Sequence, residues 1–128
     1  MKVWLSLLLL FAAMVPAGQA ADRAEAQKIE AMIASIEHLP GAVFIRNGSE
    51  YSGSQAAEHL RYKWQKADGR VKTAEDFIVL CASVSSTSGQ KYRIRGADGH
   101  TVDAEIFFRE QLRRLSSASD SATSESRP

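Results

Sequence analysis

An uncharged, mostly apolar run at the N-terminus sets how much of this chain is left to fold. The run extends for 13 residues from Val3 to Val15, behind the basic Lys2, and Pro16 interrupts it. Gly18 and Ala20 then place small residues three before and one before a cleavage point, which completes the pattern of a secretory signal peptide. Thirteen helical residues span only about 20 Å, less than the ~30 Å hydrocarbon core of a membrane. We therefore predict a cleaved signal peptide rather than a membrane anchor.

The predicted mature protein is small and electrically balanced. Cleavage of residues 1–20 would leave residues 21–128, which we expect in the periplasm, and would remove Lys2 from the 16 basic residues, so that 15 face 15 acidic ones. Zero net charge argues against a general nucleic-acid binder, and no second apolar run is long enough to span a membrane. One Cys and three scattered His make neither an intrachain disulfide nor a zinc framework, so we expect no metal and no cofactor.

The first part of the mature chain has the pattern of a helix followed by a hairpin. The helix, over 23–38, follows the capping-box sequence from Asp22 to Glu25 and ends at Pro40-Gly41. A short strand over 43–46 then reaches Asn47-Gly48, the pair best suited to a type I′ turn before a return strand. Asn47-Gly48-Ser49 also matches the glycosylation triplet, but the turn is the preferred interpretation.

Two further helices follow, each with a hydroxyl residue that can cap its start. Ser52 or Ser54 precedes a helix from Gln55 to about Ala67, which ends at Asp68-Gly69. Thr73 caps the third helix, with Asp76 three residues later. The expected buried stripes are Ala56, Leu60, Trp64 and Ala67 on the second helix, and Phe77, Leu80, Cys81 and Val84 on the third.

The C-terminal part predicts a second hairpin and a last helix. A strand over 91–95 and a short partner at 101–102 flank a turn, and the helix begins at Asp103 and ends near Leu115 with Phe108 and Leu112 in its stripe. Ile106 and Phe107 fall outside that stripe, and whether they are covered stays open. Six of the 13 residues from Ser116 to Pro128 are Ser and none is a large hydrophobe, so we expect a disordered tail.

These elements together predict a small single-domain α+β fold over residues 21–115. Their order is α-β-β-α-α-β-β-α, with four helices packed around short antiparallel hairpins. An all-α bundle that carries the hairpins as additions is the alternative. We expect the protein to be a monomer.

Four segments of the chain, taken in order, resemble a known family. They are Phe44–Gly48, His59–Trp64, Thr73–Ile78 and Ser85–Tyr92. Together they resemble the YfeK-like family of small exported bacterial proteins with a domain of unknown function, over roughly residues 29–115. The resemblance implies a bacterial periplasmic location and supplies no activity, and the serine-rich tail is not part of the family pattern.

Candidate site residues lie in the second helix and in the serine-rich loop that follows the third. His59 borders the apolar stripe, where it acts either as a general base or as a hydrogen-bonded boundary residue. The hydroxyls of the Ser85–Gly89 loop either bind an anion or a sugar or satisfy carbonyls at a helix end. Because only residues 68–72 join the two helices, we predict that His59 hydrogen-bonds within residues 83–89. The candidate ligand-binding residues are His59, Arg61, Ser85, Ser86, Ser88 and Tyr92.

The remaining chemistry-bearing residues favour structural roles. Cys81 stands on an apolar stripe, where a buried thiol is unreactive, and the basic stretch from Arg61 to Lys72 is best explained as a solvated face. No catalytic constellation is recognisable, so we predict a non-catalytic periplasmic binding or interaction module for an unknown protein or small envelope ligand. The alternative is a small cell-envelope hydrolase or modifying enzyme that uses His59 with the Ser85–Gly89 loop.

Overall fold

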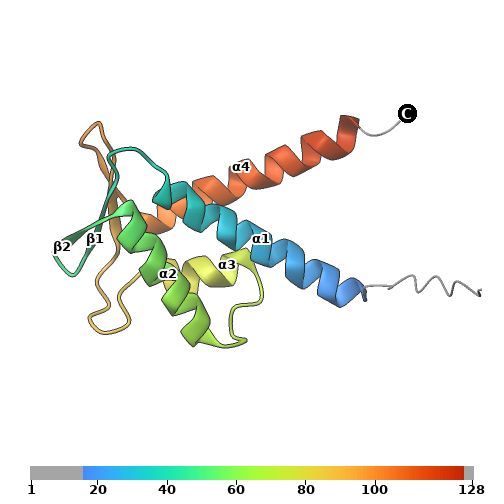
Figure 1. The fold of residues 1–128 in the computed structure, drawn as a ribbon, viewed down its shortest axis with the longest axis horizontal. Coiled ribbons are helices and arrows are strands. Elements are labelled where there is room, and N and C mark those ends of the chain that lie inside the picture. The colour runs from blue at the N-terminus through green and yellow to red at the C-terminus, as the bar shows by residue number, and fades with distance from the viewer. Residues whose placement is uncertain (1–15, 126–128) are drawn as a thin grey trace, which may run out of the picture.

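Helices and strands follow one another in the predicted order. The computed structural model describes residues 16–125, so residues 1–15 of the predicted signal peptide and the last three of the predicted tail lie outside it. Figure 1 shows the helices on one side of a small sheet, which confirms the α+β fold over the all-α alternative. The elements are α1 (Ala17–Glu37), β1 (Val43–Arg46), β2 (Ser49–Ser52), α2 (Gly53–Ala67), α3 (Ala74–Phe77), the π-helical η1 (Ile78–Ala82), β3 (Arg93–Arg95), β4 (Thr101–Asp103) and α4 (Ala104–Glu125).

The two hairpins join into one antiparallel sheet of order β2-β1-β3-β4, because β1 pairs with β3. At the first turn Asn47 and Gly48 have φ values of 52° and 77°, the positive values that a type I′ turn requires. Phe44 pairs with Tyr51 on one side and with Ile94 on the other, so these three side chains share one face of the sheet. Packing of α2 against β1 and β2, and of α4 against β3 and β4, buries that face.

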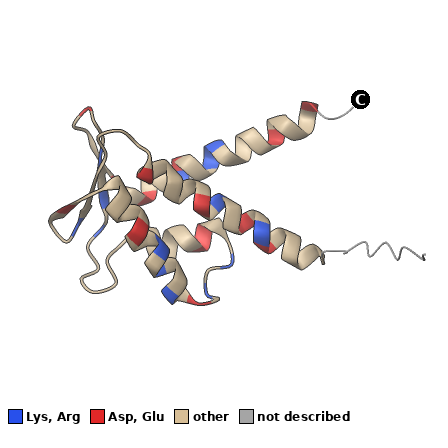
Figure 2. Cartoon of the chain, in the orientation of Figure 1, with Lys and Arg blue, Asp and Glu red and all other residues tan. Residues whose placement is uncertain are grey.

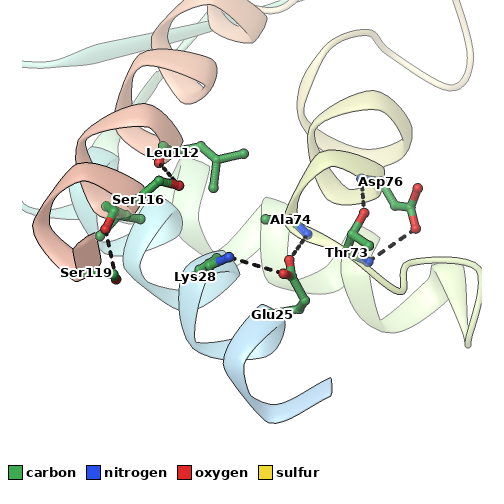
Figure 3. A network of polar contacts seen from close by, with 9 residues as sticks. Glu25, Lys28, Thr73, Ala74, Asp76, Leu112, Ser116 and Ser119 are labelled. Carbon is green, nitrogen blue, oxygen red and sulfur yellow. Dashed lines mark hydrogen bonds and ion pairs between the residues drawn. The ribbon is translucent and has the colours of Figure 1, made fainter. Parts of the chain in front are cut away.

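The start of α1 differs from the prediction. The helix begins at Ala17, directly after Pro16, and Asp22 does not cap it. Glu25 does not close a capping box either, because its carboxylate accepts a hydrogen bond from the backbone N–H of Ala74 at 2.7 Å, as Figure 3 shows. A residue expected to start one helix therefore caps the start of another.

The third helical segment combines a predicted cap with an unpredicted π turn. Thr73 and Asp76 form the expected capping box at the start of α3 (Figure 3). The chain continues as the π-helical η1, and the wider turn rotates the following side chains about the helix axis. Leu80 and Val84 are consequently 43% and 38% exposed, so their predicted burial is wrong, whereas Cys81 is buried as predicted. The buried positions of this segment are Ala74, Phe77, Ile78, Cys81 and Ala82.

The second helix is capped and packed as its sequence predicts. Ser52 and Gln55 form a capping box, and Asp68 ends the helix in the left-handed conformation. Gly53, the first residue of α2, lies against the end of α1: a Cβ added there would stand 2.4 Å from the carbonyl oxygen of Ile36. This close approach makes glycine the residue that lets α1 and α2 pack.

The last helix is longer than predicted. α4 continues past the expected end near Leu115 to Glu125, through residues that we expected to be a disordered tail. The hydroxyls of Ser116 and Ser119 donate to the carbonyl four residues earlier, which satisfies them within the helix (Figure 3). Residues 116–125 are all exposed. No helix within residues 16–125 is long and apolar enough to cross a membrane.

Of the two apolar residues near the start of α4 whose burial was left open, one is exposed and the other is covered. Ile106 is 60% exposed, whereas Phe107 packs against the core beside Phe108, with the two ring centroids 5.2 Å apart. Elsewhere on α4 and on α1, basic and acidic residues are interspersed (Figure 2), and Arg109 pairs with Glu105 in this way.

Candidate ligand pocket

A pocket of about 360 Å³ opens between the first hairpin and α2. One face of α2 lines it, because residues separated by three or four positions lie on the same side of a helix. The β1–β2 hairpin supplies the opposite wall. The residues of α2 are Gln55, Ala56, Glu58, His59 and Tyr62, and those of the hairpin are Phe44, Arg46 and Tyr51.

The partly buried guanidinium of Arg46 forms the polar part of the wall. Its Nη1 lies 3.0 Å from Nδ1 and 3.1 Å from Nε2 of His59, and its Nη2 donates to the Tyr51 hydroxyl at 3.3 Å. The guanidinium also lies over the Tyr51 ring, 5.0 Å from its centroid. Arginine has only donors, so His59 must present an unprotonated nitrogen to it. The geometry therefore requires a neutral imidazole.

Tyr92 closes the inner side of this cluster. Its hydroxyl lies 3.2 Å from Nε2 of His59 and accepts a hydrogen bond from Nζ of Lys63 at 3.1 Å. Its ring is buried and packs against Phe44, with the centroids 5.1 Å apart. Lys63 also donates to the carbonyl of Val84 at 3.0 Å. Hydrogen bonds thus connect β1 and α2 to Tyr92, which directly precedes β3, behind the pocket.

The cluster carries positive charge that no carboxylate of the described residues contacts. Burial, together with the charges of Arg46 and Lys63, lowers the pKa of His59 to about 4. Burial also lowers the pKa of Lys63 and raises that of Tyr92. At neutral pH, His59 and Tyr92 are therefore uncharged. Within residues 16–125, no group of His, Cys, Asp and Glu side chains is arranged to hold a metal ion.

Only part of the predicted ligand-binding set comes together. His59 and Tyr92 are in contact, whereas Arg61 points to α1 and pairs with Glu37 at 2.8 Å. Ser86 lines a separate pocket at the end of α2 with Lys66. The predicted set therefore divides among several places in the fold.

The predicted hydrogen bond from His59 to the serine-rich loop is wrong. Asn47 holds that loop instead: its Nδ2 donates to Ser85 Oγ at 3.2 Å, and Ser88 Oγ donates to its Oδ1. His59 is satisfied by Arg46 and Tyr92. Lys63, one turn later on α2, makes the contact to residues 83–89 through the Val84 carbonyl. The helix and loop are thus neighbours, as predicted, but a different side chain links them.

Sequence reasoning missed Arg46, Tyr51 and Lys63. A signal for Arg46 was present, because alternate residues of a strand share a face and Phe44 is an obvious core residue two positions earlier. Lys63 was grouped with the solvated basic face, although it stands one turn after His59 on α2. Its burial depends on Tyr92, which β3 positions.

Comparisons with known proteins agree with the resemblance noted above. Over 78 aligned residues, this chain is 35% identical to "Uncharacterized protein YfeK" of Salmonella typhimurium. The alignment covers 61% of this chain and 65% of that protein. The chain therefore matches less than two thirds of that relative. No solved structure is significantly similar to it. Residues 23–116 match the model described as "Family of unknown function (DUF5329)". Since this match covers most of the chain, the protein belongs to the DUF5329 family.

Proposed function

We propose that this protein is an exported, non-catalytic binding module whose ligand occupies the pocket between α2 and the first hairpin. The observation that carries the proposal is the preformed polar wall, in which His59 and Tyr51 hold the Arg46 side chain in place. Pockets for small molecules typically enclose about 300–1,000 Å³ and combine apolar lining with a few fixed polar groups. A volume of about 360 Å³ with one fixed guanidinium fits a small ligand of this kind.

The surroundings of His59 favour binding over catalysis. A base whose pKa is held near 4 has little driving force to take a proton at neutral pH. Its hydrogen-bond partners are Arg46 and Tyr92, neither of which is a nucleophile activated by a base. The hydroxyls of Ser85 and Ser88 contact Asn47 instead of His59, so the pairing that an envelope hydrolase would use is not assembled.

The proposed export is compatible with the fold. Residues 16–24 are all exposed, so cleavage after Ala20 removes no buried side chain from the described domain. We expect the mature chain to begin at Ala21 and to appear in the periplasmic fraction of bacteria that express the full chain. Intact-mass measurement of the fractionated protein checks both points. A cytosolic product that retains Met1 would contradict the proposal.

Protein-observed NMR with a fragment panel tests the binding function. The panel contains small neutral, cationic and anionic compounds, and the protein is the purified product of the full chain. We expect at least one compound to shift the amides of Arg46, Tyr51 and His59 in a saturable way. Tyr51→Ser should weaken that binding, whereas Val102→Ser, on the exposed part of β4, should leave it unchanged. A panel in which no compound shifts the pocket residues would contradict the proposal.

A further inference from the structure

We infer that the pocket binds a small organic monoanion, such as a carboxylate attached to an apolar body, and that Arg46 contacts its charged group. The inference rests on the binding function proposed above and adds the chemical class of the ligand. Three features of the pocket support it: the free donors of Arg46, the charge balance around them, and the apolar lining beside them.

The guanidinium of Arg46 retains unused hydrogen-bonding capacity. Arginine has five N–H donors in a fixed planar arrangement. One of them serves His59 and one serves Tyr51. No residue within 16–125 accepts from the other three. Because the two contacts fix the plane of the group, its remaining N–H groups are oriented before a ligand arrives. Charge-assisted hydrogen bonds from a guanidinium to a carboxylate are stronger than those between neutral groups.

The charge balance around Arg46 also favours an anion. Arg46 and Lys63 are close enough for each to lower the pKa of His59, and neither contacts a carboxylate of the described chain. Several other arginines are paired with a carboxylate: Arg95 on β3, for example, contacts Glu50 at 2.7 Å. A partly buried positive charge without a counter-charge is unfavourable, because burial removes part of its hydration. A bound anion would supply the missing counter-charge.

The rest of the lining defines what the anion is attached to. Phe44 and Ala56 form the buried apolar floor of the pocket, and the apolar surface that a ligand could cover comes mainly from Tyr62, which is 55% exposed at the rim. An apolar or aromatic body would cover this surface. Glu58 also lines the pocket and repels a second negative charge. The balance of one fixed guanidinium against one nearby carboxylate favours a single negative charge over a dianion.

A matched pair of probes tests the charge requirement. Benzoate and benzamide have nearly the same shape and differ in charge. NMR titration should show saturable shifts of Arg46, Tyr51 and His59 with benzoate, and at least tenfold weaker binding of benzamide. Acetate and phenyl phosphate extend the series toward a smaller body and a dianion, and phenyl phosphate should bind more weakly than benzoate at pH values where it carries two charges.

Three variants test the assignment of residues. Arg46→Gln should weaken benzoate binding about tenfold or more, as the loss of a charge-assisted hydrogen bond predicts. Arg93→Gln, on the neighbouring strand and outside the pocket, should leave it unchanged. Glu58→Gln should strengthen it, because the repulsion is removed. If Arg46→Gln fails to fold by circular dichroism, Arg46→Lys, which keeps the charge but loses the planar fork, replaces it and should still bind more weakly than the parent.

The ring of His59 supplies an independent readout. Burial is the main cause of the lowered pKa of His59, and the charges of Arg46 and Lys63 add to it. A benzoate on Arg46 offsets part of that charge, so the pKa of His59 should be higher with benzoate bound than with benzamide bound. Equal affinity for benzoate and benzamide would overturn the anion assignment and leave the binding function standing. Failure of acetate, benzoate and phenyl phosphate to shift the pocket residues would also overturn it, and the neutral and cationic panel members then decide the binding function separately.

Discussion

Acidification should destabilise this protein through His59 as the pH falls from about 6.5 toward 4. In the folded protein the pKa of His59 is held to about 4, against 6.5 for an unperturbed His. Between these values the unfolded chain binds a proton that the folded chain excludes. The free energy of unfolding therefore falls as the pH drops from about 6.5 toward 4. Above about pH 6.5, His59 has no effect on how the free energy of unfolding changes with pH.

The size of the effect follows from the same difference. At about 1.4 kcal/mol for each pKa unit, the upper limit is about 3 kcal/mol. The ring is only partly buried, so water and salt screen some of the repulsion from Arg46 and Lys63. We expect a loss of about 2 kcal/mol between pH 7.5 and 4.5. Glu25, whose pKa is lowered by its hydrogen bond from Ala74, loses its stabilisation only at still lower pH.

Urea unfolding at a series of pH values measures this loss, with circular dichroism as the signal. His59→Gln keeps a hydrogen-bonding side chain but removes the titration, so its free energy of unfolding should be nearly flat across the window. His100→Gln is the matched control, because the His100 side chain is 85% exposed and its substitution should retain the parental pH dependence. The reasoning is wrong if the parent shows no loss between pH 7.5 and 4.5, or if His59→Gln retains the same slope.

Three further predictions concern the fold. Gly53→Ala should lower the free energy of unfolding by about 1–3 kcal/mol, because the added Cβ would meet the Ile36 carbonyl oxygen. The exposed control Ser54→Ala should change the free energy of unfolding by less than about 0.5 kcal/mol. Urea unfolding measures both variants, and equal effects would contradict the close approach of Gly53 to α1. Cys81 is buried, and burial raises the pKa of its thiol, so it should react with a thiol reagent only after denaturation; fast labelling of the folded protein would contradict this. Deletion of residues 116–128 should leave the Tm nearly unchanged, because residues 116–125 are exposed; a fall of many degrees in calorimetry would show that the segment is docked.

The parts of the fold that neighbouring residues decide could be predicted from the sequence. Asn47-Gly48 adopts the positive φ values of its turn, and Thr73 with Asp76 satisfies backbone N–H groups within three residues. Glu25 shows where this reasoning stops. Its sequence context favours a local capping box, but its carboxylate caps Ala74, which lies 49 residues away. A long-range contact of this kind is set by how α1 packs on α3, and no local pattern contains it.

The candidate site could be predicted only in part, for the same reason. His59 and Tyr92 could be selected as polar residues near the core, but their contact depends on the pairing of β1 with β3. The packing of α2 against β1 brings Arg46, rather than a serine hydroxyl, to the imidazole. The sequence also did not indicate that the Asn47 side chain would hydrogen-bond the serine-rich loop in place of His59.

Because β1 pairs with β3, the cluster behind the pocket is complete only when a segment from late in the sequence is in place. The hairpin with Arg46 and the helix with His59 come first and can form as local structures. Tyr92, which holds the imidazole from the inner side, lies 33 residues after His59. Without that segment one edge of β1 has no partner strand and is open to pairing with other chains. A chain truncated before Tyr92 would therefore be prone to aggregate and would lack one of the two side chains that hold His59.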